Sequence, residues 1–430
     1  MRILMIADYA DPLAKVGSKS FGGIRVYTNN LGYQLSLKGI EVDLFTRCSE
    51  NSDGPEVVVI NSKFKVYRIK IGEERVPEFY TENLKKYITK TLKIIKDQHL
   101  KYNLIHANHW FSGLAGAEIS HVLHIPLVES FHSLGAVRLN VLNGFDIHTE
   151  DELMAARIRA ERKLADQLKS VIASSLSEKD FLINSYGLTD DQIKIIPIGV
   201  DKNMFYPVET AAARRILGLP KQDPILLYVG VIKFTKGLET LLYGYKKVLN
   251  QLPKAKLYIV GGDEPSSPAA KKQFTKDSDV INLKKLCKKL KIEKSVYFLG
   301  SIEQSRLYMY YSMADVCVVP SYYETFGIVP IESMACGTPV VASDVGGLKY
   351  TVANGEVGFR FKTESAQDLS RKINMVLLKG KNSFTKACLK RIDSYYNWED
   401  IAGKYIEYYK LQIPKRYSIL RHLMHPGLFR

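Results

Sequence analysis

The sequence predicts an α/β protein with two doubly wound parallel sheets that face each other across a central cleft. Short apolar runs alternate with amphipathic helical patterns in two series, which are separated by a segment punctuated with proline and glycine. The chain has 430 residues, which is too long for one ordinary hydrophobic core. We therefore expect two domains, with a ligand site where the carboxyl ends of their strands meet.

The first series is expected to form a Rossmann-like domain over residues 1–203. Its first helix is expected at Gly23–Lys38 and ends at Gly39, a residue type that commonly terminates helices. The apolar runs are uninterrupted, as in parallel strands that are buried on both faces. The expected strands are Ile3–Ala7, Val42–Phe45, Leu104–Ala107 and Pro126–Glu129.

The second series is expected to form a similar domain over residues 204–395. The segment Ile195–Asp201, followed by Phe205-Tyr206-Pro207, suits an interdomain connection. A polar insert, residues 263–279, has the composition of a long surface loop. Residues 396–430 are expected to begin with a helix that packs back on the first domain. The expected strands are Ile225–Val231, Lys256–Gly261, Val296–Gly300, Val316–Ser321 and Pro339–Ser343.

Bulk composition indicates a soluble globular protein. Hydrophobic residues make up 46% and charged residues 25%, and no run of 18 apolar residues could cross a bilayer. The five cysteines are widely spaced in apolar runs, so we expect reduced core thiols and a cytoplasmic location. A net charge of +16 predicts attraction to polyanions without identifying one.

The most informative motif combines a loop and a helix start with two carboxylates. The strand Val316–Ser321 leads into Glu324–Ile328, and Glu332 follows Glu324 by eight positions in an apolar helical run. Free N–H groups at the helix start suit a phosphate, while carboxylates can accept hydrogen bonds from sugar hydroxyls. The motif therefore predicts a site for a phosphorylated sugar, although two glutamates alone would more simply be solvated surface residues.

Two other segments offer groups for binding phosphate. Gly22 and Gly23 end a glycine-rich loop before the first helix, where a ligand could approach the backbone amides closely. Lys236 precedes the expected helix Leu238–Leu249, and a lysine there opposes the helix dipole unless an anion joins it. Three helix starts would then converge on one cleft.

Further motifs extend along nearly the whole chain. They are Gly22-Gly23 with Val26-Tyr27, Gly39–Arg47, His106 with Trp110–Gly116, His132, Ile196–Asp201, Lys236-Gly237, Ala314-Asp315, the Glu324 and Glu332 pair, and Val345-Gly346-Gly347. In this order they resemble glycosyltransferase family 4, retaining enzymes of the GT-B fold that use nucleotide-activated sugars. The stretch Asp11–Arg47 is most similar to the subgroup with sucrose-phosphate synthase and the N-acetylglucosaminyltransferase of mycothiol synthesis, which use UDP-glucose or UDP-N-acetylglucosamine.

The resemblance implies roles for the matching residues. Lys236 would neutralise the donor diphosphate, and Glu332 would bind the ribose hydroxyls. Glu324 would bind hydroxyls of the transferred sugar, and His132 would contact its 6-hydroxyl. The implied catalytic residues are His132, Lys236 and Glu324; the implied donor-binding residues are Gly22, Gly23, Lys233, Thr325, Phe326, Gly327, Ile328 and Glu332.

Some positions depart from the family pattern. Val231 occupies the place of an arginine that contacts the diphosphate, so Lys233 is the candidate substitute. Losing one charge-assisted hydrogen bond would cost donor binding about 1.5–3 kcal/mol. Arg25 and His109 stand where the mycothiol enzyme has asparagine and tyrosine, which argues against inositol phosphate as acceptor. The candidate acceptor contacts are Arg25, Lys86, His109 and Arg157.

The resemblance leads us to expect a retaining hexosyltransferase that needs neither a metal nor a cofactor besides its nucleotide sugar. Its acceptor would be a hydroxyl of a small molecule, glycan or lipid. No DxD-type pair is placed in the cleft by these motifs. A double displacement would need a carboxylate nucleophile, and near His132 the sequence offers only Glu129, inside a strand. We therefore favour front-face transfer, in which the departing phosphate oxygen takes the acceptor proton.

Alternatives from other classes stay open at this point. A UDP-sugar 2-epimerase shares the two-domain architecture and would act without an acceptor. A nucleic-acid-binding protein would explain the charge and the lysine-rich segment Leu283–Lys291, but no nucleic-acid motif occurs, and the spacing there favours an amphipathic helix with a solvated lysine face. Peripheral contact with the inner face of the membrane is compatible with glycosyl transfer to a lipid.

Overall fold

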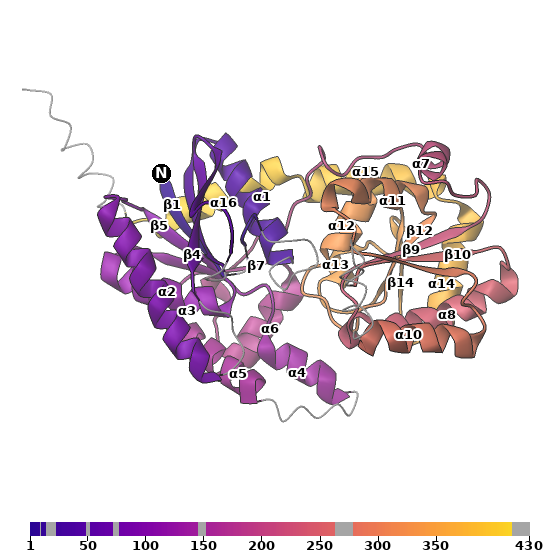
Figure 1. The fold of residues 1–430 in the computed structure, drawn as a ribbon, viewed down its shortest axis with the longest axis horizontal. Helices are drawn as coiled ribbons and strands as arrows, with labels where there is room; N and C mark the ends of the chain where they lie inside the picture. The colour runs from indigo at the N-terminus through magenta and orange to yellow at the C-terminus, as the bar shows by residue number, and fades with distance from the viewer. Residues whose placement is uncertain are drawn as a thin grey trace, which may run out of the picture.

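The computed structural model describes residues 1–8, 10–13, 23–48, 52–71, 77–144, 152–262 and 278–414. Two α/β domains lie side by side, each built around its own sheet (Figure 1). Gly22, most of the expected surface insert and the basic tail after Pro414 lie outside the described residues.

The first domain has an eight-stranded sheet in the order β3-β4-β2-β1-β5-β6-β7-β8. Its elements are β1 Arg2–Ala7, α1 Gly23–Leu37, β2 Glu41–Cys48, β3 Val57–Asn61, β4 Phe64–Lys70, α2 Pro77–Asp97, β5 Leu104–Asn108, α3 Trp110–Leu123, β6 Leu127–Ser130, α4 Gly135–Gly144, α5 Glu152–Ala165, β7 Val171–Ala173, α6 Leu176–Tyr186, η1 Asp190–Gln192 and β8 Ile193–Ile195.

The second domain has a six-stranded parallel sheet in the order β11-β10-β9-β12-β13-β14. Its elements, with the helices that follow it, are α7 Thr210–Ile216, β9 Ile225–Val229, η2 Phe234–Lys236, α8 Leu238–Gln251, β10 Lys256–Val260, α10 Ser278–Leu290, β11 Val296–Gly300, η3 Gln304–Arg306, α11 Leu307–Met313, β12 Val316–Val319, α12 Ile328–Ala335, β13 Val340–Ser343, α13 Leu348–Thr351, β14 Gly358–Phe361, α14 Ala366–Lys379, α15 Asn382–Tyr395 and α16 Trp398–Gln412.

The prediction of two doubly wound α/β domains is confirmed, but five strands lie outside those expected and the first sheet is not wholly parallel. Residues 3–7 of β1 are fully buried, as expected of a central strand covered on both faces. The strands not expected are β3, β4, β7 and β8 in the first domain and β14 in the second, and β3 pairs antiparallel with β4. Val59 and Ile60 of β3 are exposed, so this edge strand lacks the alternation of buried and exposed residues by which strands are recognised.

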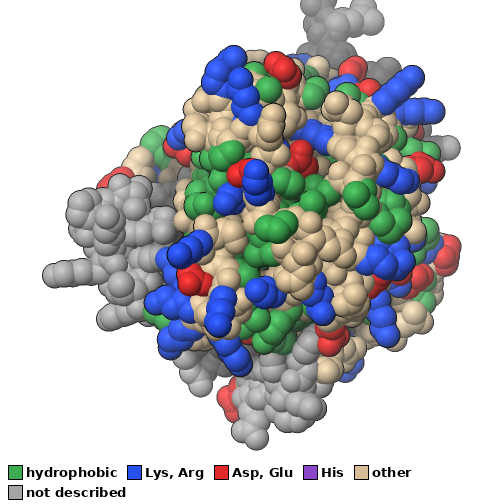
Figure 2. Space-filling model, turned by 90° about the vertical axis from the view of Figure 1, so that its right-hand side faces the viewer, with side chains coloured by type: hydrophobic (Ala, Val, Ile, Leu, Met, Phe, Trp, Pro, Cys, Tyr) green, Lys and Arg blue, Asp and Glu red, His purple; other side chains and the backbone are tan. Residues whose placement is uncertain are grey.

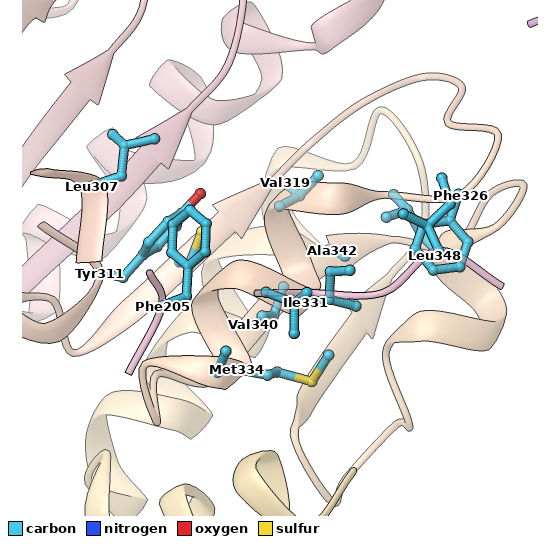
Figure 3. Close-up of a cluster of buried hydrophobic side chains, with 14 of the residues drawn as sticks. Phe205, Leu307, Tyr311, Val319, Phe326, Ile331, Met334, Val340, Ala342 and Leu348 are labelled. Atoms are coloured by element: carbon cyan, nitrogen blue, oxygen red, sulfur yellow. The ribbon is translucent and has the colours of Figure 1, made fainter. Parts of the chain in front are cut away.

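The core beneath α12 fixes the start of this helix at the end of β12. Ile331 and Met334 of α12 point into the cluster that contains Val340 and Ala342 of β13 (Figure 3). All four side chains are fully buried. A helix held by its apolar face in this way presents its amino end at a fixed place above the sheet edge.

Two chain segments that cross between the domains lie side by side. Val200 forms a parallel bridge with Asn397, and its amide donates to the carbonyl of Tyr396 at 2.9 Å. A Cβ atom at Gly199 would lie 2.5 Å from the ring of Trp398, so only glycine allows this approach. Helix α16, yellow in Figure 1, then packs against α1 of the first domain.

The outer face of the second domain carries dispersed positive charge. Figure 2 shows lysine and arginine side chains spread over this face among acidic and apolar ones. In α10, Leu283 and Cys287 are buried while Lys284, Lys285 and Lys288 are exposed, as the spacing predicted. All five cysteines are buried free thiols. Among the described helices, none is long and apolar enough to span a bilayer.

Candidate active site

A cleft of about 380 Å³ lies between the carboxyl edges of the two sheets. The two walls also meet directly, because the Ser175 hydroxyl at the cap of α6 donates to the carbonyl of Thr325 at 2.9 Å. Both domains and their connection therefore contribute to one site. The cleft is lined by Gly23, Ile24, Tyr27, His132, Ser133 and Ser174 from the first domain, Ile198 from the connection, and Tyr228–Val231, Lys236, Val319, Ser321 and Glu324–Pro330 from the second.

Glycines beneath the loop Glu324–Gly327 allow it to fold tightly against the next loop. A Cβ atom at Gly346 would lie 2.1 Å from the carbonyl oxygen of Glu324, and one at Gly347 would lie 2.3 Å from that of Thr325. The amide of Gly347 donates to the Glu324 carbonyl at 2.8 Å. The motif Val345-Gly346-Gly347 thus acts as the floor that shapes the carboxylate loop.

Lys236 and Glu324 form an ion pair inside the cleft. Lys236 ends the short helix η2, and the following Gly237 could not carry a Cβ, which would lie 2.0 Å from the Pro320 carbonyl. This close approach brings the lysine to the end of β12, where its Nζ donates to Glu324 Oε2 at 2.6 Å. Ser321 Oγ donates to the same oxygen at 3.3 Å. Among the described residues that line the cleft, Lys236 is the single lysine or arginine.

The starts of α1 and α12 face each other across the cleft. A Cβ atom on Gly23, the first residue of α1, would be 3.4 Å from Ile328 Cδ1 at the start of α12. Gly327 caps α12 with a left-handed φ of 96°, a conformation that side chains other than glycine rarely adopt. Free amides at both helix starts create a positive electrostatic potential beside Lys236. The arrangement suits a diphosphate.

Glu332 lies one turn into α12 and is 5% exposed, outside the set of residues that line the cleft. Its Oε2 accepts a hydrogen bond from the Tyr311 hydroxyl at 2.7 Å, and its Oε1 accepts one from Gln304 Nε2 at 3.4 Å. Burial raises the pKa of Glu332 to about 7, although both hydrogen bonds act to lower it. The carboxyl group therefore titrates near neutral pH.

His132 lies at the centre of a tight turn after β6. The Ser133 amide donates to the Phe131 carbonyl at 2.6 Å, and His132 has a φ of +59°. This three-residue turn is rare because it strains a side-chain-bearing residue. The ring Nε2 is 3.0 Å from Asn108 Oδ1. Burial, reinforced by the nearby His106 and His109, lowers the pKa of His132 to about 3, so its imidazole is neutral at ordinary pH.

Buried side chains from α5 and α6 hold this turn in place. Burial raises the pKa of Glu178, the nearby His132 backbone acts to lower it, and Glu178 Oε2 accepts the amide of Ser174 at 2.7 Å. Arg157 Nη2 donates to the carbonyl of Ser133 at 2.8 Å and to its hydroxyl at 2.9 Å. Arg157 Nε in turn donates to Glu161 at 2.6 Å, and Glu161 accepts the amide of Gly135 at 2.9 Å. The strained turn is thus held on both sides.

Each of the four candidate acceptor contacts has a partner elsewhere in the chain. Arg157 is engaged with the His132 turn, as described above. Arg25 donates to the Pro12 carbonyl at 2.9 Å, and His109 Nδ1 lies 3.5 Å from Asp8. Lys86 pairs with Glu82 on the exposed face of α2. None of the four belongs to the described lining of the cleft.

The departure at Val231 is visible in the cleft wall. Val231 lines the cleft and is 49% exposed. Lys233, the candidate substitute for the family arginine, caps η2 with an exposed side chain and lies outside the described lining. The wall beside Lys236 is therefore apolar where the family pattern has a cation.

Glu129 lies away from the cleft. Its carboxyl group is fully buried in β6 against α3, and a Cβ atom at Gly113 would be 2.7 Å from its Oε2. Neither carboxyl oxygen has a hydrogen-bond partner. Burial, together with Asp8, Glu161 and Glu178, raises the pKa of Glu129 well above its ordinary value. A buried, protonated carboxyl outside the cleft cannot attack a sugar.

Several residues that shape the site carried no functional prediction. Asn108 and Glu161 are buried polar residues whose contacts with His132 and Gly135 span 24 and 26 positions of the sequence, so only the fold brings them to this turn. Tyr27, part of the first glycine motif, packs its ring edge-on against His132 at 4.5 Å between centroids. A buried polar residue at the end of an apolar strand is the signal that could have identified Asn108.

Comparisons with known proteins agree with this geometry. Residues 21–203 match the model described as Glycosyltransferase Family 4, and residues 209–389 match that of Glycosyl transferases group 1. The chain is 33% identical to a D-inositol 3-phosphate glycosyltransferase of Corynebacterium aurimucosum over 384 residues, which are 88% of each chain. The structure is similar to sucrose-phosphate synthase of Thermosynechococcus elongatus, with a TM-score of 0.82, 32% identity and coverage of 95% and 98%. The fold is also shared with Anabaena HepE in complex with UDP and glucose, at a TM-score of 0.71, 20% identity and coverage of 96% and 100%.

Proposed function

Because this chain belongs to glycosyltransferase family 4 and has the GT-B fold, we propose that it transfers a hexose from a UDP-sugar to an acceptor hydroxyl with retention at the anomeric carbon. The donor sugar in this proposal is glucose or N-acetylglucosamine. The acceptor is a small molecule, a glycan or a lipid. No metal ion takes part.

The Lys236–Glu324 pair carries the proposal. A cation suited to phosphate and a carboxylate suited to sugar hydroxyls are joined at 2.6 Å in one cleft. The starts of α1 and α12 add backbone amides beside the lysine. A nucleotide sugar has both kinds of group next to each other, at the bond between phosphate and anomeric carbon, so its diphosphate and hexose match the two halves of the pair.

The proposed mechanism depends on stabilising the leaving group. Cleavage of the anomeric bond places negative charge on the departing diphosphate, which Lys236 and the helix-start amides would stabilise in a preorganised arrangement. Among the described residues lining the cleft, Glu324 is the one carboxylate, and it is bound to Lys236. Front-face transfer, with the departing phosphate oxygen accepting the acceptor proton, needs no carboxylate nucleophile. Double displacement through Glu129 is incompatible with its burial away from the cleft.

The donor and acceptor remain the parts of the proposal to be measured. The curated relative is named as acting on D-inositol 3-phosphate, and sucrose-phosphate synthase makes a phosphorylated disaccharide, so phosphorylated acceptors are the first to test. If the acceptor is a lipid, we expect the chain to bind a membrane surface. Sedimentation with liposomes of increasing anionic-lipid content would detect it, and binding independent of that content would dismiss it.

A donor screen tests the proposal directly. The purified chain is incubated with UDP-, GDP- and ADP-sugars, and release of each nucleotide is followed by mass spectrometry, first alone and then with pools of acceptors. We expect release of UDP that accelerates when the right acceptor is present. If an epimerised UDP-sugar forms without an acceptor, the chain is an epimerase and not a transferase. Release of nucleotide from none of the donors would overturn the proposal.

A further inference from the structure

Asn108, the last residue of β5, is a fully buried amide behind the cleft wall. Its Nδ2 group donates to the carbonyls of Ile6 at 3.3 Å and His106 at 3.2 Å. Its Oδ1 lies 3.0 Å from His132 Nε2. Both N–H groups of the amide therefore face backbone acceptors, and this fixes which end of the side chain faces the histidine.

The orientation of Asn108 determines the hydrogen on His132. An amide oxygen can only accept a hydrogen bond, so Nε2 of the imidazole must carry the hydrogen. In a neutral imidazole the other ring nitrogen, Nδ1, is then a lone-pair acceptor. His132 lines the cleft, and its ring is held edge-on by Tyr27 from the side of α1.

We propose that Asn108 is a positioning residue that fixes His132 as the Nε2–H tautomer, so that Nδ1 accepts a hydrogen bond from a hydroxyl of the donor sugar. This rests on the proposed function and on the family resemblance, which implies that His132 contacts the transferred hexose. Asn108 itself stays behind the histidine and touches no substrate. Its effect on transfer is carried entirely by the tautomer and orientation of the ring.

The surroundings of His132 keep the ring neutral. Burial and two neighbouring histidines lower its pKa to about 3, so the ring does not become an imidazolium in the working range. Glu178 Oε2 accepts hydrogen bonds from the amide and the hydroxyl of Ser174. The titratable groups facing His132 are Tyr27 of α1, His106 of β5, His109 after β5 and Glu178 of α6, with Lys236 and Glu324 lining the same cleft.

A neutral acceptor at this place determines which sugars fit. A hydroxymethyl group can donate its hydrogen to Nδ1. The carboxylate of a hexuronic acid has no hydrogen to donate and would place its lone pairs against that of the nitrogen. The tautomer therefore selects neutral hexoses over hexuronates at the position that His132 contacts.

Nitrogen-15 NMR of the full-length protein labelled in histidine tests the tautomer directly. The His132 resonance is assigned by its loss in His132→Gln. We expect the shift pattern of an Nε2–H imidazole, unchanged between pH 8 and pH 5. An Nδ1–H pattern, or an imidazolium at pH 6, would overturn the proposal. This measurement needs no variant of Asn108 to fold.

Asn108→Asp supplies the kinetic test. The carboxylate keeps a hydrogen-bond acceptor at Nε2 but raises the pKa of His132, so imidazolium forms and Nδ1 becomes a donor. We expect kcat/KM for UDP-glucose to fall roughly tenfold or more at pH 6 and to recover at higher pH, while the ratio for UDP-glucose over UDP-glucuronate narrows roughly tenfold. An unchanged pH profile together with an unchanged donor ratio would contradict the proposal.

Asn374→Asp is the matched control, because Asn374 is a buried asparagine on α14 whose amide donates to Gln251. Its pH profile and donor ratio should match those of the wild type. Binding of UDP alone, measured by calorimetry, distinguishes failure of the tautomer proposal from failure of the proposed function. If the wild type binds UDP and transfers sugar while Asn108→Asp behaves as wild type, the tautomer proposal fails alone. If the wild type binds no nucleotide, the proposed function fails.

Discussion

The two walls of the cleft are built in different ways. The second domain presents charged groups on loops that glycines allow to approach one another: Lys236 beside Gly237, and Glu324 above Gly346. The first domain presents a neutral histidine on a strained turn, held by buried polar side chains from several elements. On one side the chemistry is local in sequence, and on the other it is assembled from distant residues.

This difference indicates which changes each wall can tolerate. The loops of the second domain should lose their shape when one of their glycines gains a side chain, because the new Cβ atom would clash with backbone atoms of the neighbouring loop. A turn held at several points should instead lose activity in steps as single partners are removed. The following predictions use that contrast, from the largest expected effect to the smallest.

Lys236→Ala should produce the largest loss. Removing the cation that stabilises the departing diphosphate should lower kcat roughly 100- to 1000-fold at saturating donor. Steady-state kinetics with UDP detection measures this. Lys247→Ala, which removes an exposed lysine from the next helix, is the control and should retain wild-type turnover. Near-normal turnover of Lys236→Ala would remove the lysine from the mechanism.

Gly347→Ala should damage the donor wall without touching a charged group. Gly347 has φ −65°, which alanine adopts freely, so the effect comes from close approach to backbone, at 2.3 Å from the Thr325 carbonyl oxygen and 2.5 Å from Phe326 Cα. Overpacking of this kind costs about 1–3 kcal/mol. UDP affinity measured by calorimetry should fall accordingly. Gly403→Ala on α16, where a Cβ meets nothing within 4 Å, should leave the affinity unchanged. Equal UDP affinities for the two variants would show that the loop Glu324–Gly327 accommodates the added Cβ atom and would contradict the prediction.

Donor binding to the free enzyme should strengthen as pH rises through about 7. The pKa of Glu332 lies there, and the ionised carboxylate is the stronger acceptor for the ribose hydroxyls that the family resemblance assigns to it. Well below pH 7, kcat/KM for the donor should fall about tenfold per pH unit. Tyr311→Phe removes a hydrogen bond to the carboxylate, so the inflection should move to higher pH.

Tyr245→Phe is the control for this shift, since Tyr245 is a buried tyrosine of α8 whose hydroxyl donates to backbone carbonyls. Its pH profile should match that of the wild type. A wild-type profile without an inflection between pH 6 and pH 8 would remove Glu332 from donor binding.

Glu129→Gln should alter stability rather than catalysis. The folded-state pKa of Glu129 lies above its unfolded value of about 4.3, so the folded protein binds the proton more tightly than the unfolded chain. Its contribution to stability is present below that pH and is lost as pH rises through the folded-state pKa. Glutamine keeps the shape and cannot ionise.

Thermal unfolding between pH 5 and pH 9 measures this difference. The melting temperature of the wild type should decline more with rising pH than that of Glu129→Gln, with a gap of a few degrees, roughly, at pH 9. Turnover should stay unchanged, because Glu129 lies outside the cleft. If the melting temperatures of the two proteins change in parallel over the whole pH range, Glu129 ionises in the folded protein and the prediction is wrong.

The fold and the donor wall could be predicted because their signals are local. Apolar runs such as Leu104–Ala107 and Val316–Val319 need only their own residues to indicate a buried strand. Lys236 and Glu324 likewise belong to short motifs that place them just before the helices α8 and α12. Their pairing follows from the topology, since the neighbouring strands β9 and β12 end at the same edge of the sheet.

The first-domain wall could not be predicted because its determinants are tertiary. Arg157 is a candidate acceptor contact by sequence, while the structure engages it with Ser133 and Glu161. Nothing in the residues around Asn108 indicates that it faces His132, which is 24 positions away. The edge strand β3 could not be predicted for another reason. Its exposed Val59 and Ile60 do not alternate with polar residues as in a half-buried strand.

The bridge between Val200 and Asn397 has a consequence for motion. Since the chain passes between the domains at two adjacent points, the domains share a paired hinge rather than a single flexible linker. A paired hinge permits rotation about the line through both crossings and resists torsion around the chain direction. We expect the enzyme to open and shut along one angular coordinate, which distances between spin labels on α4 and α10 would report as a single correlated change.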